Sequence, residues 1–278
     1  MRTQRKPTAP AIHIKGSMAA DLAAALDPVV FAQDRLKFDP DPWQSAFLRE
    51  GGNSLLNCCR QSGKSTTTAI KGLHVAHYQP RALVLLVSKA FRQSQELFGK
   101  VTEFRERLSP GPSLIEDNKL SATFTNGARI VCLPGSADTI RGFSGPRLII
   151  EDEAAFVDDA VYTAIRPMLA VSGGQLVLMS TPHGRRGHFY EAHRSGEFRN
   201  FMVTADQCPR ISKAFLASER RAFGESLYRQ EYFCEFLDTI DQLFRTEHIE
   251  RAVSDDVQPL FGKSGEDTLQ PMKLGAFQ

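Results

Sequence analysis

The segment 54–66 combines residue types that bind phosphate. A short apolar stretch, 54–57, leads into a loop and then into Gly63-Lys64-Ser65 at the expected start of a helix. In this context the loop N–H groups and the helix N-terminus point at an anion. Gly63 would let the backbone approach closely, Lys64 would reach the β- and γ-phosphates, and the Ser65 hydroxyl would bind Mg²⁺. The segment therefore predicts a phosphate-binding loop.

Two features limit how specific this signal is. The first glycine of the pattern G-x-x-x-x-G-K-[ST] is replaced by Cys58, so the strict pattern fails. A second Gly-Lys-Ser, at 262–264, follows no apolar stretch and precedes no helical pattern, and we interpret it as a solvated loop. Only the first copy has the strand, loop and helix that a phosphate site requires.

A second segment ends an apolar strand in carboxylates. Residues 147–150 predict a buried strand, which would place Asp152 and Glu153 at the carboxyl edge of a sheet, where ligands bind. Asp152 is the natural Mg²⁺ partner, directly or through water. Glu153 would orient and deprotonate an attacking water. The alternative is a solvated acidic turn that caps the next helix, and the phosphate loop upstream favours the functional interpretation.

Two further polar groups fit a nucleotide site. The strand predicted at 175–179 ends in Ser180 and Thr181, whose hydroxyls can sense a γ-phosphate and pass its loss to the next segment. A simple end to the strand is the alternative, because Pro182 follows. Upstream of the first strand, the amide of Gln44 offers a donor and an acceptor that suit the edge of an adenine.

The hydrophobic pattern predicts the framework that would bring these residues together. Apolar runs without polar alternation are spaced by amphipathic segments, which indicates a mostly parallel sheet covered by helices on both faces. The predicted strands are 54–57, 82–87, 130–133, 147–150 and 176–179, and the predicted helices are 65–78, 91–108 and 160–169. Residues 119–124 and 128–133, joined through Asn126-Gly127, predict an inserted hairpin.

The chain is expected to have three parts. Residues 1–37 form an N-terminal arm with a short helix at 18–26, stopped by Pro28. Residues 38–210 form the phosphate-loop core, and 211–278 form a small helical subdomain and linker, with helices at 213–223 and 226–236. The expected fold class is α/β, a P-loop NTPase of the ASCE type with a small helical lid or linker subdomain.

Composition excludes several classes. The 278 residues carry 34 Lys plus Arg and 32 Asp plus Glu, a net charge of +2 that neither indicates nor excludes a nucleic-acid partner. There is no run of ~18 apolar residues that would span a membrane. The five cysteines include no C-x-x-C pair, which argues against zinc or a disulfide framework and for a reducing cytoplasm.

In this order, the segments resemble the ATPase domain of the large terminase subunit of tailed bacteriophages, the motor that packages DNA. Residues 60–66 resemble its variant Walker A loop, 149–156 its Walker B strand, 178–184 its coupling motif, and 41–44 its adenine-side motif. Residues 140–144 resemble the segment that carries an arginine finger. The nucleotide-binding residues that the resemblance implies are Gln44, Arg60, Gln61, Ser62, Gly63, Lys64, Ser65 and Thr66.

The resemblance also implies a mechanism, the Mg²⁺-dependent hydrolysis of ATP that drives double-stranded DNA into a procapsid. Ser65 and Asp152 are then the metal ligands, and Glu153 activates water. Lys64 and Arg60 act on the phosphates within the subunit, and Arg141 is the candidate finger that reaches the site of a neighbouring subunit. The residues implied for coupling are Ser180 and Thr181.

The partners implied by the resemblance are double-stranded DNA, the portal protein and the small terminase subunit. Working motors of the family are homo-oligomeric rings, pentamers, in the cytoplasm of the infected bacterial host, and an isolated domain could be monomeric. Family members also carry a nuclease domain, and this sequence stops about where it would begin, so nuclease activity is not expected.

Three alternatives stay open at this stage. A helicase-like DNA translocase shares the catalytic class, but a second motor core does not fit after residue 236. A small-molecule kinase would need neither Glu153 beside Asp152 nor the Ser-Thr-Pro strand end. A non-catalytic nucleotide-binding switch is the remaining possibility, and release of phosphate from ATP would distinguish it.

Overall fold

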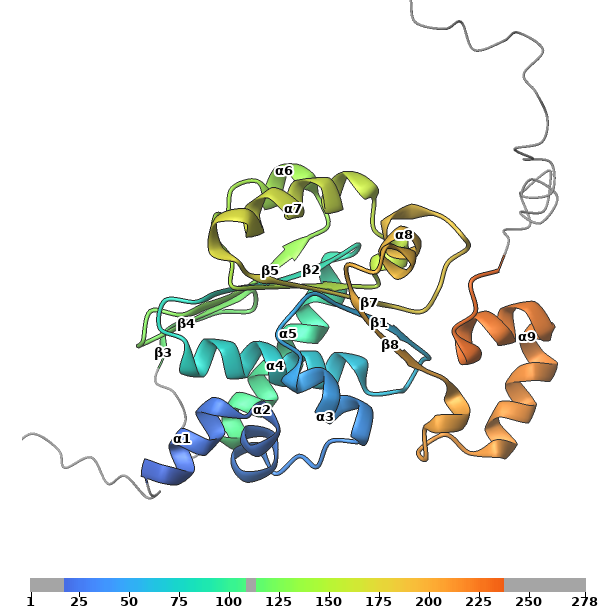
Figure 1. Ribbon diagram of the computed structural model, residues 1–278, viewed down its shortest axis with the longest axis horizontal. Coiled ribbons are helices and arrows are strands. Elements are labelled where there is room, and N and C mark those ends of the chain that lie inside the picture. Colours follow the sequence, from blue (N-terminus) through green and yellow to red (C-terminus); the bar gives the residue numbers. More distant parts are fainter. Residues whose placement is uncertain (1–17, 109–113, 238–278) are drawn as a thin grey trace, which may run out of the picture. The chain divides into compact units, whose positions relative to one another are not determined.

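An eight-stranded sheet forms the centre of the protein, in the order β3-β4-β5-β2-β6-β7-β1-β8 (Figure 1). The structure is a computed structural model that describes residues 18–108 and 114–237. The strands are Ser54–Cys58 (β1), Leu83–Ser88 (β2), Leu114–Asp117 (β3), Ser121–Phe124 (β4), Arg129–Pro134 (β5), Leu148–Asp152 (β6), Gln175–Ser180 (β7) and Arg199–Val203 (β8).

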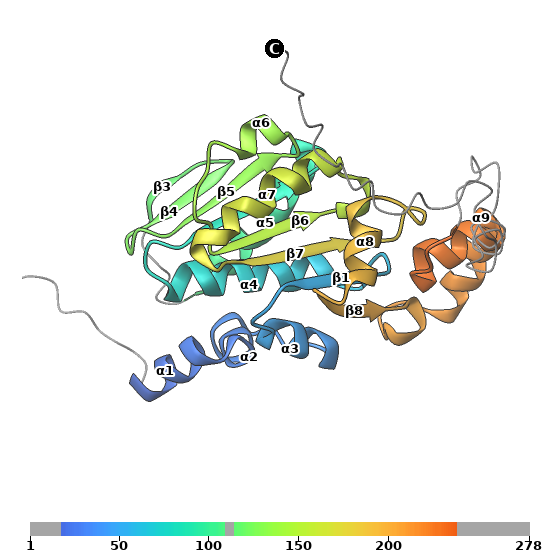
Figure 2. The same ribbon diagram turned by 45° about the horizontal axis from the view of Figure 1, so that its top comes forward.

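Helices cover both faces of this sheet. On one face lie α3, α4 and α5 together with the N-terminal helices, and on the other lie α6, α7 and α8 (Figures 1 and 2). The α-helices are Met18–Leu26 (α1), Pro28–Val30 (α2), Pro42–Arg49 (α3), Lys64–Tyr78 (α4), Phe91–Arg107 (α5), Ala137–Ile140 (α6), Asp159–Ser172 (α7), Gly187–Ser195 (α8) and Lys213–Phe233 (α9). Short π- and 3₁₀-helical turns occupy Phe31–Arg35, Ala154–Phe156 and Ala205–Gln207.

The order of the strands fixes where the predicted motifs meet. β7 pairs in parallel with both β1 and β6, so it separates the strand of the phosphate loop from the acidic strand. β2 continues the parallel sheet beyond β6, and β8 continues it beyond β1. This arrangement confirms the predicted α/β P-loop NTPase fold of the ASCE type. All three motif-bearing strands end at one edge of the sheet.

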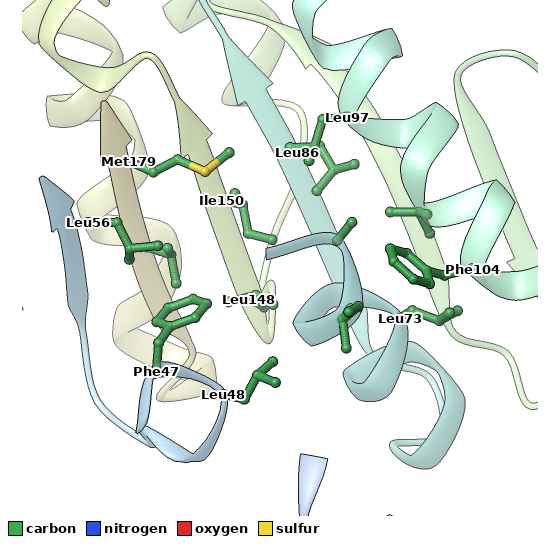
Figure 3. Close-up of a cluster of buried hydrophobic side chains, with 14 of the residues drawn as sticks. Phe47, Leu48, Leu56, Leu73, Leu86, Leu97, Phe104, Leu148, Ile150 and Met179 are labelled. Atoms are coloured by element: carbon green, nitrogen blue, oxygen red, sulfur yellow. The ribbon is translucent and has the colours of Figure 1, made fainter. Parts of the chain in front are cut away.

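The central strands are apolar because both of their faces are buried. On one face, strand residues such as Leu56, Leu86, Ile150 and Met179 pack with Leu73 of α4 and Phe104 of α5 (Figure 3). The alternate strand residues form a second cluster with α7 and α8, which includes Leu55, Leu85, Ile149, Leu178, Ile165 and Phe189. The absence of polar alternation in the sequence therefore reflects a sheet sandwiched between two helical layers.

Some local expectations are confirmed and two differ from the structure. The short helix predicted at 18–26 is confirmed, because α1 ends at Leu26. Pro28 then begins the separate helix α2, where its missing N–H costs nothing. The hairpin of β4 and β5 exists, but it is no separate insertion, because β5 also pairs in parallel with β2. The helices predicted at 213–223 and 226–236 are two segments of α9, broken at Gly224, which has φ of 74°, and the second segment ends at Phe233.

All five cysteines are buried free thiols. Among the described residues no helix is long and apolar enough to cross a membrane.

Candidate active site

The phosphate loop depends on a glycine at position 63. Gly63 has φ of +96°, and a Cβ at this position would lie 2.7 Å from Nε2 of Gln44. Both the backbone conformation and the lack of space therefore require glycine. Arg210 supports the loop from outside, because its Nη2 donates to the carbonyl of Ser62 at 3.0 Å and to Oδ2 of Asp41 at 2.8 Å.

Cys58, which replaces the first glycine of the usual pattern, belongs to the strand rather than to the loop. It is the last residue of β1, is fully buried, and pairs with Val203 of β8. Burial raises the pKa of its thiol well above the usual range. The residue that departs from the strict pattern therefore packs as part of the strand and needs no glycine. The positive φ angles of the loop occur at Gln61 and Gly63.

Several of the predicted site residues line one cavity of about 360 Å³ at the carboxyl edge of the sheet. It contains six of the residues singled out in the sequence, which are Arg60, Gln61, Lys64, Ser65, Asp152 and Glu153. They come from the loop after β1, the first turn of α4 and the end of β6. The topology therefore brings a lysine, a hydroxyl and two carboxylates into one pocket, as the sequence predicts.

The carboxylates differ in environment. Asp152 is 8% exposed, and burial, together with the neighbouring charge of Glu153, raises its pKa to about 6, although Lys64 acts in the opposite direction. Glu153 has φ of +52° where the strand ends, and its N–H donates to Oδ1 of Asp152 at 2.9 Å. Oγ of Ser180, at the end of β7, donates to Oε2 of Glu153 at 3.2 Å.

Arg60 joins the loop to α9. Its Nε donates to Oε2 of Glu231 at 2.6 Å, with the Arg60 side chain 59% exposed and the Glu231 side chain 12% exposed. A second link lies behind the loop, where Nδ2 of Asn57 donates to the carbonyl of Cys234 at 2.9 Å. The helical segment after the core therefore contacts both the phosphate loop and the strand that precedes it.

Other predicted site residues lie outside the cavity. Arg141 ends α6 with its side chain 67% exposed, and its Nη1 is 3.7 Å from Oδ1 of Asp138. Gln44 is buried, and its Oε1 accepts from the N–H of Asp41 at 2.8 Å, which closes the start of α3. Thr181 is buried beside Ser180. The roles assigned to these side chains stay predictions. The second Gly-Lys-Ser, at 262–264, lies outside the described residues.

One wall of the cavity was missed by the sequence motifs. Helix α5 contributes Gln93, Glu96, Leu97 and Lys100. The spacing i, i+3, i+4 and i+7 places these residues on one face of a helix. That periodicity is the signal that could have identified the wall, although it does not by itself say what the face meets.

Three ionisable side chains contact one another on the opposite side of β6 from Asp152, and two of them, Glu151 and His188, are buried. Glu151 is fully buried, and its Oε2 is 3.3 Å from Nε2 of His188 in α8. Nδ1 of His188 is 2.9 Å from Oδ1 of Asp159, the first residue of α7, and the ring of Tyr162 stacks on the imidazole. Buried charges need such partners, so these contacts tie the acidic strand to both helices of that face.

The fold and the cavity define a P-loop NTPase of the ASCE class. Residues 55–251 match the family described as terminase large subunit, T4-like-virus type, N-terminal, and the chain belongs to this family. It is 27% identical over 250 residues to the terminase large subunit of Thermus phage G20c, which covers 75% of this chain and 51% of that protein. The chain thus spans about half the length of the curated relatives it matches.

The solved structures that resemble this fold include two large terminases. The ATPase domain of the Thermus phage P74-26 large terminase superposes with a TM-score of 0.69 at 22% identity, covering 76% of this chain and 100% of that chain. The large terminase of another thermophilic bacteriophage, solved in complex with ADP, superposes with a TM-score of 0.57 at 12% identity, covering 71% of this chain and 54% of that chain. At these identities the likeness establishes the shared fold.

Proposed function

We propose that this chain is the ATPase motor domain of a viral terminase large subunit, which hydrolyses ATP to drive double-stranded DNA into a procapsid. The observation that carries the proposal is the single cavity that joins Lys64 and Ser65 to Asp152 and Glu153. Family membership supports it, and so does the ADP bound by the large terminase of the same fold from a thermophilic bacteriophage.

The cavity residues divide the reaction among them. The Lys64 ammonium and the loop N–H groups hold the β- and γ-phosphates. Glu153 orients the attacking water and takes its proton, and Ser180 holds the carboxylate in place. Water adds to the γ-phosphorus as the bond to the β-phosphate oxygen breaks, which yields ADP and inorganic phosphate.

The donor set fits Mg²⁺. Ser65 and Asp152 supply a hydroxyl and a carboxylate to the same cavity, and Mg²⁺ prefers a few such oxygen ligands together with water and substrate phosphates. When bound, Mg²⁺ would neutralise charge on the phosphates. Ser65 and Asp152 are therefore the ligands we assign.

Assembly completes the proposal. The exposed Arg141 lies outside the cavity of its own subunit and is available as a finger for a neighbouring one in a homo-oligomeric ring, a pentamer in the working motor. The proposed partners are DNA, the portal protein and the small terminase subunit, in the cytoplasm of the infected host.

Phosphate release from ATP tests the proposal. We expect Mg²⁺-dependent release by the wild type that EDTA abolishes, a loss of at least about a hundredfold in kcat for Glu153→Gln, and weakened ATP binding for Lys64→Ala. A wild type no faster than either variant would contradict the ATPase assignment. Phosphate that appears on a small-molecule acceptor instead of in solution would identify a kinase.

A further inference from the structure

Helix α5 brings a second lysine into the nucleotide cavity. Lys100 lines the same cavity as Lys64 and Asp152. Its Nζ donates to Oγ1 of Thr66 at 3.4 Å, in the first turn of α4. Lys100 is half-buried, and its positive charge acts on the Asp152 carboxylate. The ammonium therefore lies beside the phosphate loop, although the residue is far from any nucleotide motif in the sequence.

The packing of α5 makes this placement specific. The helix runs along α4, and Phe98, Val101 and Phe104 anchor it in the hydrophobic core. A buried helix face of this kind prevents rotation about the helix axis, because turning it would expose the aromatic side chains. Lys100 is consequently held on the cavity side, next to the start of α4, where phosphate-binding groups gather.

Lys100 forms no direct ion pair with a carboxylate of the described residues. Over residues 18–108 and 114–237 no carboxylate lies within ion-pair distance of its ammonium, and Glu96, one turn earlier, pairs with Arg92 at 3.3 Å. Lys64, which is 8% exposed, likewise forms no ion pair with a described carboxylate. The cavity also carries the carboxylates of Glu96, Asp152 and Glu153. The two ammonium groups lie at the phosphate loop and the start of α4, a position that suits the negative oxygens of a polyphosphate.

We propose that Lys100 is a phosphate-binding residue, whose ammonium donates to phosphate oxygens of the bound nucleotide on the Thr66 side of the loop. This inference rests on the proposed function and adds to its site a residue that lies outside the phosphate loop. Because ADP carries phosphate oxygens at the loop as ATP does, Lys100 contributes to the binding of both nucleotides rather than to hydrolysis alone.

Equilibrium binding of a fluorescent ADP analogue tests the proposal, with Mg²⁺ and again with EDTA. We expect Lys100→Ala to raise Kd about tenfold in both conditions, as the loss of a charge-assisted hydrogen bond predicts. Lys100→Arg keeps the charge and should stay closer to the wild type. The matched control is Lys213→Ala, which removes an exposed ammonium at the start of α9.

Three results would overturn the proposal. Lys100→Ala could bind ADP as tightly as Lys213→Ala does, or the loss of affinity could occur only with Mg²⁺, which would make Lys100 a counter-charge for Asp152. A wild type that binds no ADP would overturn it together with the proposed function. A wild type that binds ADP but hydrolyses no ATP contradicts only the proposed function.

If Lys100→Ala melts at a lower temperature, Lys100→Met preserves the packed stem and gives the same comparison.

Discussion

Oγ of Ser180 donates a hydrogen bond to Oε2 of Glu153 across 3.2 Å. The two residues end neighbouring strands, since β7 pairs in parallel with β6 up to the register of Met179 with Asp152. Ser180 is fully buried, so its hydroxyl has a fixed place from which to hold the carboxylate. The residue assigned to coupling thus contacts the residue assigned as general base.

Removing this hydroxyl should slow hydrolysis without weakening binding. We expect Ser180→Ala to lower kcat about tenfold or more, since a hydrogen bond to a charged group is lost and Glu153 is no longer oriented. KM should change little, and steady-state ATPase kinetics measure both. Ser195→Ala is the matched control, because its hydroxyl donates to the carbonyl of Ala192 away from the cavity. A kcat equal to that of the control would contradict the assigned role.

The ion pair of Arg60 with Glu231 should compete with nucleotide phosphates. Glu231→Ala frees the guanidinium, and we expect the affinity for a non-hydrolysable ATP analogue to rise by about threefold, a small effect because Arg60 is largely exposed. Glu235→Ala is the control, since Glu235 pairs with Arg229. Titration calorimetry on both variants would show the difference. Weaker binding by Glu231→Ala would mean that the pair supports the nucleotide-binding form of the loop.

Arg141 should act only between subunits. If it reaches a neighbouring site, the wild-type rate per subunit rises with protein concentration. Arg141→Ala stays slow at every concentration, with a kcat lower by about 10³-fold or more. Arg129→Ala, which removes another exposed arginine, should behave as the wild type. ATPase assays over a dilution series make the comparison. A wild-type rate per subunit that does not depend on concentration removes the finger between subunits.

The trio of Glu151, His188 and Asp159 should make stability depend on pH. Burial lowers the pKa of His188, but the two carboxylates outweigh it, and the pKa lies above its ordinary 6.5. The stabilisation by this imidazolium is therefore complete below about pH 6.5 and is lost as the pH rises through the raised pKa. Urea unfolding over a pH series should show that the free energy of unfolding of the wild type exceeds that of His188→Asn by less as the pH rises.

A second histidine provides a control of opposite sign. Burial lowers the pKa of His193, so the contribution of its neutral imidazole to the free energy of unfolding is lost as the pH falls below 6.5. The difference between wild type and His193→Asn should then change with pH in the opposite direction. Parallel pH profiles for the two variants would contradict the charged pairing of His188.

Local sequence patterns were sufficient to predict several of the side chains that line the cavity. The phosphate loop, the acidic strand end and the Ser180 strand end are each such patterns, in which an apolar run is followed at once by the reactive side chain. Parallel strands deliver their carboxyl ends to one edge of a sheet, so a correct fold class was enough to bring Lys64, Asp152 and Glu153 together. Gly63 was predictable for a separate reason, because a tight loop needs a residue with a positive φ.

Packing between distant elements determines which other side chains complete that site. Lys100 and Glu231 occur in helices whose sequences carry no nucleotide motif, and each reaches its partner through contacts between elements far apart in the chain. The same holds for His188, which contacts Glu151 on the other face of β6. Periodicity shows that a helix has a polar face but not what that face meets. The partner is set by how each helix buries its apolar face against the sheet, and that arrangement depends on the whole core.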